Sequence, residues 1–396
     1  MLGQSKEPSD AGQFPDGAEG SRYFDLPSRD FARGTPFEPY AQVYSSAWHS
    51  IRKLIARLRA HSIGVLIDLH ALPGGANNQA HSSTNSGCEE LWNSTFNRAL
   101  GVKCCEFLAR DAQTGSDIVG IQLVNEAEWD APAMYEWYDQ CIAAISPVDP
   151  TILVVVTDGW NLSKSIEYCL GKNSVYALHP TAPVVIDTHY YWAFTDQDKQ
   201  KSSQEITDHV PSKLSELNGK EGSVIDRGAA QVIVDLVMLK VSNFNSVPGG
   251  SFFWTWEMDW MPGGEWGFVT KSDARNICPP EHAMLPQQDR STRLQKAICE
   301  RDARFHAARE AHVSFWSQAD PHGNYEHQKY EHGWKVGYQD AFAFLEARAS
   351  QGDKIGMLEL WVLKRIKESG YRGGQTWQFE HGVREGIKDF YKAVEL

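Results

Sequence analysis

The sequence predicts an α/β protein built from parallel strand and helix units, followed by a region that is mostly helical. Six short apolar segments follow one another between about residues 64 and 256. Stretches with helical periodicity or polar composition separate them, and beyond about Pro280 the chain becomes rich in helix-forming, His and aromatic residues. Strands that alternate with helices form parallel βαβ units. This pattern alone leaves open whether the units close into a barrel or form an open sheet.

The elements are expected in a definite order. Residues 1–40 are rich in Gly, Pro, Ser and Asp without periodicity, which predicts an irregular lead-in. The spacing of apolar residues predicts helices at residues 41–61, 89–110 and 134–145. Strands are predicted at residues 64–70, 118–124, 151–158, 183–191, 229–234 and 250–256. We therefore divide the chain into the lead-in, an α/β region at 41–279 and a helical region at 280–396.

The composition argues against several classes of protein. With 38 basic and 51 acidic residues the net charge is −13, which disfavours nucleic acid as a partner. No run approaches the roughly 18 apolar residues of a membrane span, and the amino terminus has no apolar signal segment, so we expect no membrane span and a cytoplasmic protein. No Gly-rich nucleotide-binding motif follows any strand, and the seven cysteines include no CxxC pair. We therefore expect no cofactor, no structural zinc and no disulfide framework.

The predicted strand at residues 118–124 ends in the adjacent pair Asn125 and Glu126. Its β-branched and large apolar residues are typical of a strand that is covered on both faces of a parallel sheet. A carboxylate at the carboxyl end of such a strand is a candidate for chemistry, because the sites of parallel α/β folds lie beyond these ends. The alternative is that Glu126 only caps the next helix.

Other predicted strand ends carry pairs of polar or aromatic residues two positions apart. The pairs are Asp68 and His70, His189 and Tyr191, and Trp254 and Trp256. A spacing of two places both members on the same face of a strand, so each pair would point into one site. Carboxylates, imidazoles and a tyrosine near tryptophans suit a sugar, whose C–H face stacks on aromatic rings while polar groups bind its hydroxyls. The alternative for each His alone is a polar residue at a loop junction.

At these residues the chain resembles glycoside hydrolase family 5. The segments that carry the resemblance are LIDLHALPGG from Leu66, VNEAEW from Val124, DTHYYWAF from Asp187 and FFWTWEMDW from Phe252. They are similar, in this order, to the family's third-, fourth-, sixth- and eighth-strand segments, and most like those of the fungal exo-β-1,3-glucanase branch. The resemblance covers about residues 21–268. It implies a TIM (β/α)8-type barrel, here incomplete, with about six recognisable strands.

The resemblance also implies an activity and roles for particular residues. It implies a retaining β-glycosidase whose substrate is a β-glucan or β-glucoside, with Glu126 as the acid/base. Asn125 would bind the sugar 2-hydroxyl near the nucleophile. The residues that would shape the glycone subsite are His70, His189, Tyr191 and Trp256.

Two features depart from the family. Its nucleophile is a Glu that ends the seventh strand, whereas the segment at residues 229–234 runs on without one. Asp235 is the nearest carboxylate to that place, and Glu265 lies after the predicted last strand. The family's first two strands are not recognisable in residues 1–40. Three explanations are open: the lead-in rearranges, another surface covers the gap, or the chain is truncated at its amino end and shortened around the seventh strand. We favour the last.

The helical C-terminal region contains an internal repeat. YEHGWKVGYQDAF from Tyr330 and FEHGVREGIKDFY from Phe379 share the pattern aromatic-Glu-His-Gly-x-x-x-Gly-x-x-Asp, 49 residues apart. The two Glu-His pairs are conceivable metal ligands. We favour polar residues near helix starts, with the glycines allowing two helices to pack closely. The pattern gives no function for this region.

Three functions follow, in order of preference. The first is a retaining β-glycosidase, and the second is a catalytically inactive carbohydrate-binding protein, favoured by the absent nucleophile and the additional helical region. The third is a metal-dependent barrel hydrolase, because His and carboxylate groups at strand ends also bind divalent metals. Its ligands would come from Asp68, His70, Glu126, Asp187 and His189. The glycone, the aglycone, exo or endo action and the oligomeric state stay open.

Overall fold

The computed structural model describes most of the chain from Ala47 to the C-terminus. The described residues are 47–61, 63–84, 86–114, 118–176, 182–191, 196–202, 205, 212, 215, 223–229, 232–237, 250–253, 256–257, 267–275, 285–347 and 354–396. The predicted lead-in, Trp254 and Glu265 lie outside these residues. Within β5, defined below, only the backbone is described.

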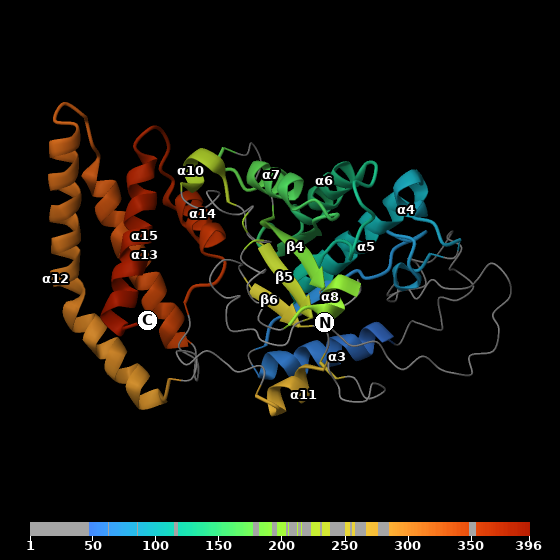
Figure 1. Ribbon diagram of the computed structural model, residues 1–396. Coiled ribbons are helices and arrows are strands. Elements are labelled where there is room, and N and C mark those ends of the chain that lie inside the picture. Colours follow the sequence, from blue (N-terminus) through green and yellow to red (C-terminus); the bar gives the residue numbers. More distant parts are fainter. Residues whose placement is uncertain are drawn as a thin grey trace.

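The described strands form one parallel sheet. They are β1 (Val65–Asp68), β2 (Ile118–Gln122), β3 (Leu153–Thr157), β4 (Val184–Tyr191), β5 (Val232–Val237) and β6 (Gly250–Phe253). All neighbouring strands are parallel, and their order in the sheet is their order in the chain (Figure 1). The carboxyl ends of the strands therefore meet at one edge, as the predicted βαβ units require. The predicted mixture of parallel strands and C-terminal helices is confirmed.

The predicted bounds of the fifth strand are wrong. β5 begins at Val232 rather than Ala229, so Asp235 lies inside the strand and not after it. The physical reason is the loop before the strand, where Ala229 exchanges backbone and side-chain hydrogen bonds with Asn173 at the end of the preceding helix. These bonds hold Ala229 outside the ladder.

Helices precede β1 and connect the first four strands. They are α3 (Ala47–Ala60), α4 (Glu90–Asn93), α5 (Thr95–Gln113), α6 (Met134–Ile145) and α7 (Leu162–Lys172). The predicted helix at 89–110 is divided into α4 and α5 by Ser94. This residue is extended, and its hydroxyl accepts a hydrogen bond from the Asn97 N–H, which caps the start of α5.

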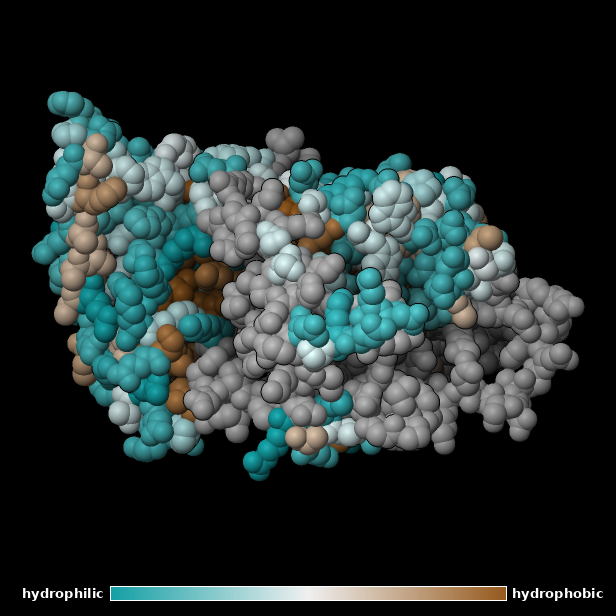
Figure 2. All heavy atoms as spheres, viewed as in Figure 1, coloured by the Kyte–Doolittle hydropathy of each residue, from teal (hydrophilic) through white to brown (hydrophobic). Residues whose placement is uncertain are grey.

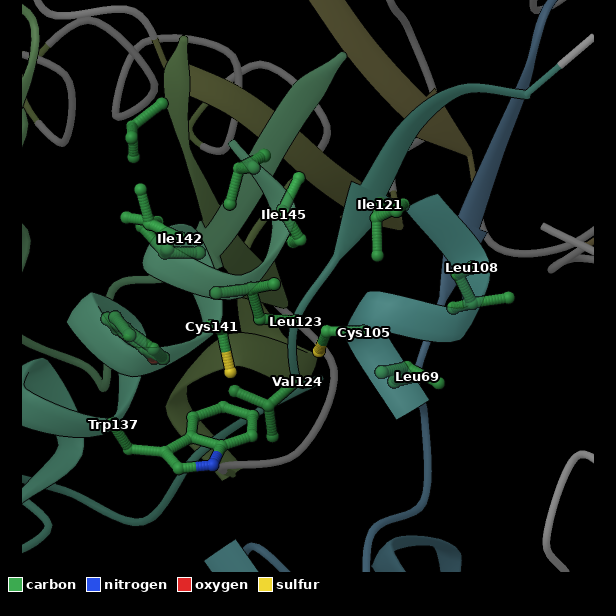
Figure 3. Packing of buried hydrophobic residues seen from close by; sticks show 14 of the residues in the cluster. Leu69, Cys105, Leu108, Ile121, Leu123, Val124, Trp137, Cys141, Ile142 and Ile145 are labelled. Carbon is green, nitrogen blue, oxygen red and sulfur yellow. The ribbon is translucent and has the colours of Figure 1, made fainter. Parts of the chain in front are cut away.

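The core beside β2 is apolar and tightly filled by α5 and α6. Trp137 of α6 is fully buried and belongs to the same apolar cluster as Val124, Cys105 and Cys141 (Figure 3). A side chain at Gly101 of α5 would overlap the Trp137 indole, so the glycine allows this close contact. This packing fixes Leu123 and Val124, which follow β2 and immediately precede Asn125.

The prediction that this strand is covered on both faces is wrong at one position. Val119 is 49% exposed, whereas the other residues of β2 are buried. Val119 lies at the amino end of the strand beside Gly64, which has no side chain to cover it.

The described part of the C-terminal region contains four long helices. They are α12 (Gln287–Ala319), α13 (His327–Ala347), α14 (Leu358–Ser369) and α15 (Thr376–Val394). The two copies of the sequence repeat lie in α13 and α15, which pack side by side (Figure 1). A Cβ added to any of the repeat glycines would overlap the backbone of the opposite helix; these are Gly333, Gly337, Gly382 and Gly386. The predicted role of the glycines in close helix packing is confirmed.

The C-terminal helices are joined to the sheet by apolar and polar contacts. Val155 of β3 and Val185 of β4 belong to the same buried cluster as the core residues of α13, α14 and α15. Figure 2 shows hydrophobic atoms in a hollow beside these helices. The carboxylate of Glu380 accepts hydrogen bonds from the N–H groups of Val224 and Ile225, at 2.7 and 3.1 Å, at the start of α10 (Val224–Arg227). Glu380 is thus a structural residue that caps a short helix before β5.

The remaining short helices are η2 (Ala80–Ser82), α8 (Asp196–Gln200) and α11 (Phe268–Asp273). Among the described helices, none is long and apolar enough to cross a bilayer.

Candidate active site

The carboxylate of Glu126 lies just beyond the carboxyl end of β2, between two imidazoles. Its Oε1 is 2.8 Å from Nδ1 of His189, and its Oε2 is 3.3 Å from Nε2 of His81. The side chain of Glu126 is 17% exposed. Both oxygens are therefore held in place while the group stays within reach of a molecule at this edge of the sheet.

His189 in β4 connects Glu126 to a second carboxylate. Nε2 of His189 is 2.7 Å from Oδ2 of Asp187, and the amide of Gln122 donates to the same oxygen at 2.7 Å. The Tyr191 hydroxyl is 3.0 Å from Nδ1 of His189. Asp187, His189 and Tyr191 alternate along β4, so they share one face, as their spacing predicts. With a carboxylate at each ring nitrogen, the imidazole can carry a proton between the two acids.

The backbone of Glu126 adopts a conformation that is rare for a residue with a side chain. Its φ is +42°, in the left-handed region, which costs on the order of 1 kcal/mol for a residue other than Gly or Asn. The amide of Asn77 donates to the Glu126 carbonyl at 2.6 Å and helps to hold this turn. Strain of this kind persists where the surrounding structure imposes it, and such positions cluster at functional sites.

A second pair of polar residues lies beside Glu126. Nδ1 of His70 is 2.8 Å from Oδ2 of Asp68, and Nε2 of the same ring is 3.5 Å from the Asn125 amide. The His70 and His81 rings are 5.4 Å apart. Burial lowers the pKa of His70, but the hydrogen bond and the charge of Asp68 outweigh it and raise that pKa above its ordinary value.

The electrostatics of Glu126 are dominated by its imidazole partners. Burial by itself would raise the pKa of this carboxyl group. The hydrogen bonds and charges of His189 and His81 outweigh burial and hold the pKa of Glu126 below its ordinary range. The carboxylate is therefore ionised at neutral pH.

The structure brings most of the predicted site residues together. His70 and Asn125 form one hydrogen-bonded pair, and Glu126, His189 and Tyr191 form a second set. The peptide bond between Asn125 and Glu126 joins the two. Trp256 is 62% exposed, and its ring stacks on Phe268 at 5.5 Å rather than on these residues. The Cα of Asp235 is paired with the Cα of His189 across β5 and β4, and its side chain is not among those described.

Residue patterns did not reveal two members of the site. His81 lies in η2 and Asn77 in the loop before it, within the polar run ANNQAH that follows the first strand. Nothing in that run marks either residue, because both reach Glu126 through contacts between distant parts of the chain.

The alternative of a metal site finds no support in the described part of the chain. No group of three or more His, Cys, Asp or Glu side chains there is arranged to hold a metal ion. In the C-terminal repeat, Glu331 pairs with Arg309 and His332 contacts the hydroxyl of Tyr371.

The fold and this site define a class: a parallel α/β protein with a glutamate and imidazoles at the carboxyl edge of its sheet. Residues 297–394 match the family described as the glucan 1,3-beta-glucosidase 3 C-terminal domain. The chain is 26% identical to glucan 1,3-beta-glucosidase 3 of Schizosaccharomyces pombe, over 91% of this chain and 76% of that protein. It is 28% identical to an uncharacterised glycosyl hydrolase of Saccharomyces cerevisiae, over 90% of this chain and 72% of that one. Over most of its length the chain is therefore similar, as a distant homologue, to fungal glucan 1,3-β-glucosidases.

Two further comparisons cover less of the relatives or of the chain. A probable glucan 1,3-beta-glucosidase A of Aspergillus clavatus is 27% identical, over 52% of this chain and 46% of that protein. A rutinosidase structure from Aspergillus niger aligns with a TM-score of 0.42 at 14% identity, over 61% of this chain and 72% of that one.

Proposed function

We propose that the protein is a glycoside hydrolase of the retaining β-glycosidase type that cleaves β-glucosidic bonds in a β-1,3-glucan or β-glucoside. The observation that carries the proposal is the carboxylate of Glu126, held by His189 and His81 at the edge of a parallel sheet. The family relationship supports the substrate class. In this proposal the six described parallel strands are those of an incomplete (β/α)8-type barrel.

Glu126 is the proposed acid/base. In a retaining mechanism one carboxyl group protonates the leaving oxygen and later removes a proton from the attacking water. The carboxylate must gain its proton before the first step, and the imidazole of His189, in contact with both Glu126 and Asp187, is placed to deliver it. Asn125 would bind the 2-hydroxyl. The proposed glycone subsite consists of His70, His189, Tyr191 and Trp256.

Asp235 is the proposed nucleophile. A retaining enzyme needs a second carboxylate about 5 Å from the first. Asp235 is supported by its place in the sheet, because its Cα pairs with that of His189, whose imidazole contacts Glu126. Its side chain is one methylene shorter than the Glu of the family.

The proposal is tested by hydrolysis of an aryl β-glucoside and of laminarin. Glu126→Gln keeps the shape of the side chain and removes its proton transfer, so we expect laminarin hydrolysis to fall by roughly 10²- to 10⁴-fold. Glu128→Gln is the matched control, because Glu128 is on the same loop and its Oε1 accepts a hydrogen bond from the N–H of Trp129 instead. Hydrolysis that survives Glu126→Gln refutes the role of Glu126, and hydrolysis that survives Asp235→Ala refutes that of Asp235.

A glucan-binding protein without turnover is the second candidate. Two observations favour it: the sequence has no Glu at the end of the seventh-strand segment, and the imidazoles keep the pKa of Glu126 low. This candidate requires laminari-oligosaccharides to bind without being cleaved. Weaker binding in Trp256→Ala would then locate the ligand at the edge of the sheet.

A further inference from the structure

A cavity of about 510 Å³ lies between α12 and α15, away from the residues of the candidate active site. This volume is typical of sites that hold small ligands. It is lined by Arg304, Ala307, Ala308, Ala311, His312, Phe315, Trp316, Tyr330, His381, Glu385, Asp389 and Lys392. We call it the α12–α15 groove. Its alanines leave room where larger side chains of α12 would have closed the contact between the two helices.

Aromatic rings form one part of the groove. Phe315 is 60% exposed, and its ring contacts the Trp316 ring with centres 5.1 Å apart. His312 stacks on Tyr330 with ring centres 3.8 Å apart. Flat rings beside open space are the surfaces on which the C–H face of a sugar stacks.

The charged residues of the groove are already paired. Lys392 contacts Asp389 at 3.0 Å, and Arg304 contacts Glu300 at 2.6 Å. Glu385 contacts Lys388 at 3.1 Å. Since each charge has a nearby opposite charge, the groove offers no net attraction for an anion or a cation. It suits a neutral ligand with many polar groups.

His312, which lines this groove, has one buried hydrogen-bonding position that no described residue uses. The residue is 5% exposed, and its Nε2 is 3.3 Å from Oε1 of Gln378. The Gln378 amide nitrogen donates to Gln375, so Oε1 of Gln378 accepts from His312. Burial lowers the pKa of His312 to about 4, and the ring is neutral at pH 7. Nδ1 is then an acceptor, and it has no hydrogen-bond partner among the described residues.

We propose that the α12–α15 groove binds a neutral glucan oligosaccharide, as a second carbohydrate site separate from the one at Glu126. The aromatic rings would stack on glucosyl units. Nδ1 of His312 is enclosed in this structure, so a sugar hydroxyl would donate to it only after the neighbouring side chains move. The choice of a glucan among neutral sugars rests on the proposed function. The proposal that the groove binds a neutral sugar does not rest on it. A C-terminal helical region with this site would hold a polymer close to the sheet.

A second cavity on α12 shows that these features are not common to all the hollows of the region. It measures about 560 Å³ and is lined by residues that include Phe305, Trp334, Lys335, Asp340 and Arg365. Its groups contact each other: Arg365 binds Asp340 through two hydrogen bonds, and Lys335 lies over the Phe305 ring at 4.6 Å. None of the residues lining this second cavity is among the described ones with an unpartnered buried polar atom.

The test measures binding of laminarihexaose to the full chain by calorimetry. The background is the double variant Glu126→Gln and Trp256→Ala. Glu126→Gln removes turnover, and Trp256→Ala weakens binding at the sheet edge. Phe315→Ala should weaken the remaining binding by roughly five- to tenfold. Ala311→Leu should abolish it by filling the groove. Ile298→Ala is the matched control, because Ile298 is an exposed apolar residue of α12 outside the groove, and it should leave binding unchanged.

The outcomes separate this proposal from the proposed function. Binding that is lost in Phe315→Ala and Ala311→Leu supports the groove, even if the wild-type chain cleaves no aryl β-glucoside. Binding that is the same in both groove variants as in Ile298→Ala overturns it, even if the chain is an active hydrolase. Absence of binding in the background variant also overturns it. Equal binding of maltohexaose would support the groove and refute its preference for the β-glucan.

Discussion

Two glutamates, Glu126 and Glu380, show how differently this molecule uses the same side chain. Both are held by well-formed hydrogen bonds and are mostly shielded from water, with side chains that are 17% and 4% exposed. The carboxylate of Glu380 accepts from two backbone N–H groups and from Arg384, which also binds Glu359. That of Glu126 is bound by two imidazoles.

The difference lies in the partners and not in the burial. Backbone amides and an arginine do not change their protonation between pH 4 and 10, so Glu380 has a fixed charge in a fixed place. Imidazoles titrate near neutrality and exchange protons with a carboxyl group. The Glu380 arrangement is suited to joining the C-terminal helices to α10, and that of Glu126 to proton transfer.

The largest expected effect is on the free energy of unfolding, which should fall more when Glu380 is replaced than when Glu126 is. Glu380→Ala leaves the Val224 and Ile225 N–H groups without an acceptor in the interior, and we expect the free energy of unfolding to fall by about 3 kcal/mol. Glu126→Ala should cost only about 1 kcal/mol, because His189 keeps Asp187 and Tyr191 as partners and His81 keeps Asn77. Urea denaturation at pH 7 measures both values.

The comparison would be contradicted if the order of the two losses of stability were reversed. A larger loss of stability in Glu126→Ala than in Glu380→Ala would make Glu126 the structural residue. Glu331→Ala is a useful reference, because its partner is the partly exposed Arg309 and the expected loss is below about 1 kcal/mol.

Much of the fold could be predicted from the sequence, because local patterns encode it. The apolar runs identified the parallel strands, and helical spacing located α6 with its observed bounds. The start of β5 could not be predicted, since it depends on the hydrogen bonds between Asn173 and Ala229, which are far apart in the chain. The exposure of Val119 likewise depends on its neighbour Gly64, which lies just before β1.

The candidate site could be predicted in part. Strand spacing placed His189 and Tyr191 on one face, and the position of Glu126 followed from the end of β2. His81 was not predictable, because it lies in the short helix η2, which is distant from Glu126 in the sequence and meets it only in the fold. The Glu-His pair at Glu380 was as conspicuous in sequence as Asn125 and Glu126. Only its backbone partners show that it is structural.

The next prediction concerns Gly382, which lies two residues after this structural glutamate. A Cβ at Gly382 would overlap the Tyr330 carbonyl, and in a closely packed helix pair the backbones must move apart. We expect Gly382→Ala to lower the free energy of unfolding by about 1 to 3 kcal/mol. Thermal or urea denaturation measures the change.

Gly171→Ala is the matched control. Gly171 lies in α7 with no atom within 4 Å of an added Cβ. In a helix without a clash, alanine should raise the free energy of unfolding by about 0.5 to 1 kcal/mol. If both substitutions stabilise the protein, the close contact of α13 and α15 is not required, and the C-terminal repeat has to be explained in another way.

The smallest expected effect tests how the imidazoles set the pKa of Glu126, which is the electrostatic difference between Glu126 and Glu380. In a general acid mechanism the rate falls as the pH rises through the pKa of the acid, because the proton is lost. His81 helps to lower the pKa of Glu126, so His81→Phe should raise that pKa and shift the alkaline limb of kcat/KM upward by about one pH unit. The pH profile of aryl β-glucoside hydrolysis measures the shift.

His81→Gln distinguishes the two ways in which His81 acts on Glu126. The amide can still donate a hydrogen bond to Oε2 but carries no charge, so a shift close to zero would assign the effect to the hydrogen bond, and a shift as large as that of His81→Phe would assign it to charge. His61→Gln, on the exposed end of α3, should leave the profile in place. If the alkaline limb of kcat/KM does not move in His81→Phe, His189 is the single imidazole that sets the charge of Glu126. The comparison with Glu380 would then depend on His189 alone.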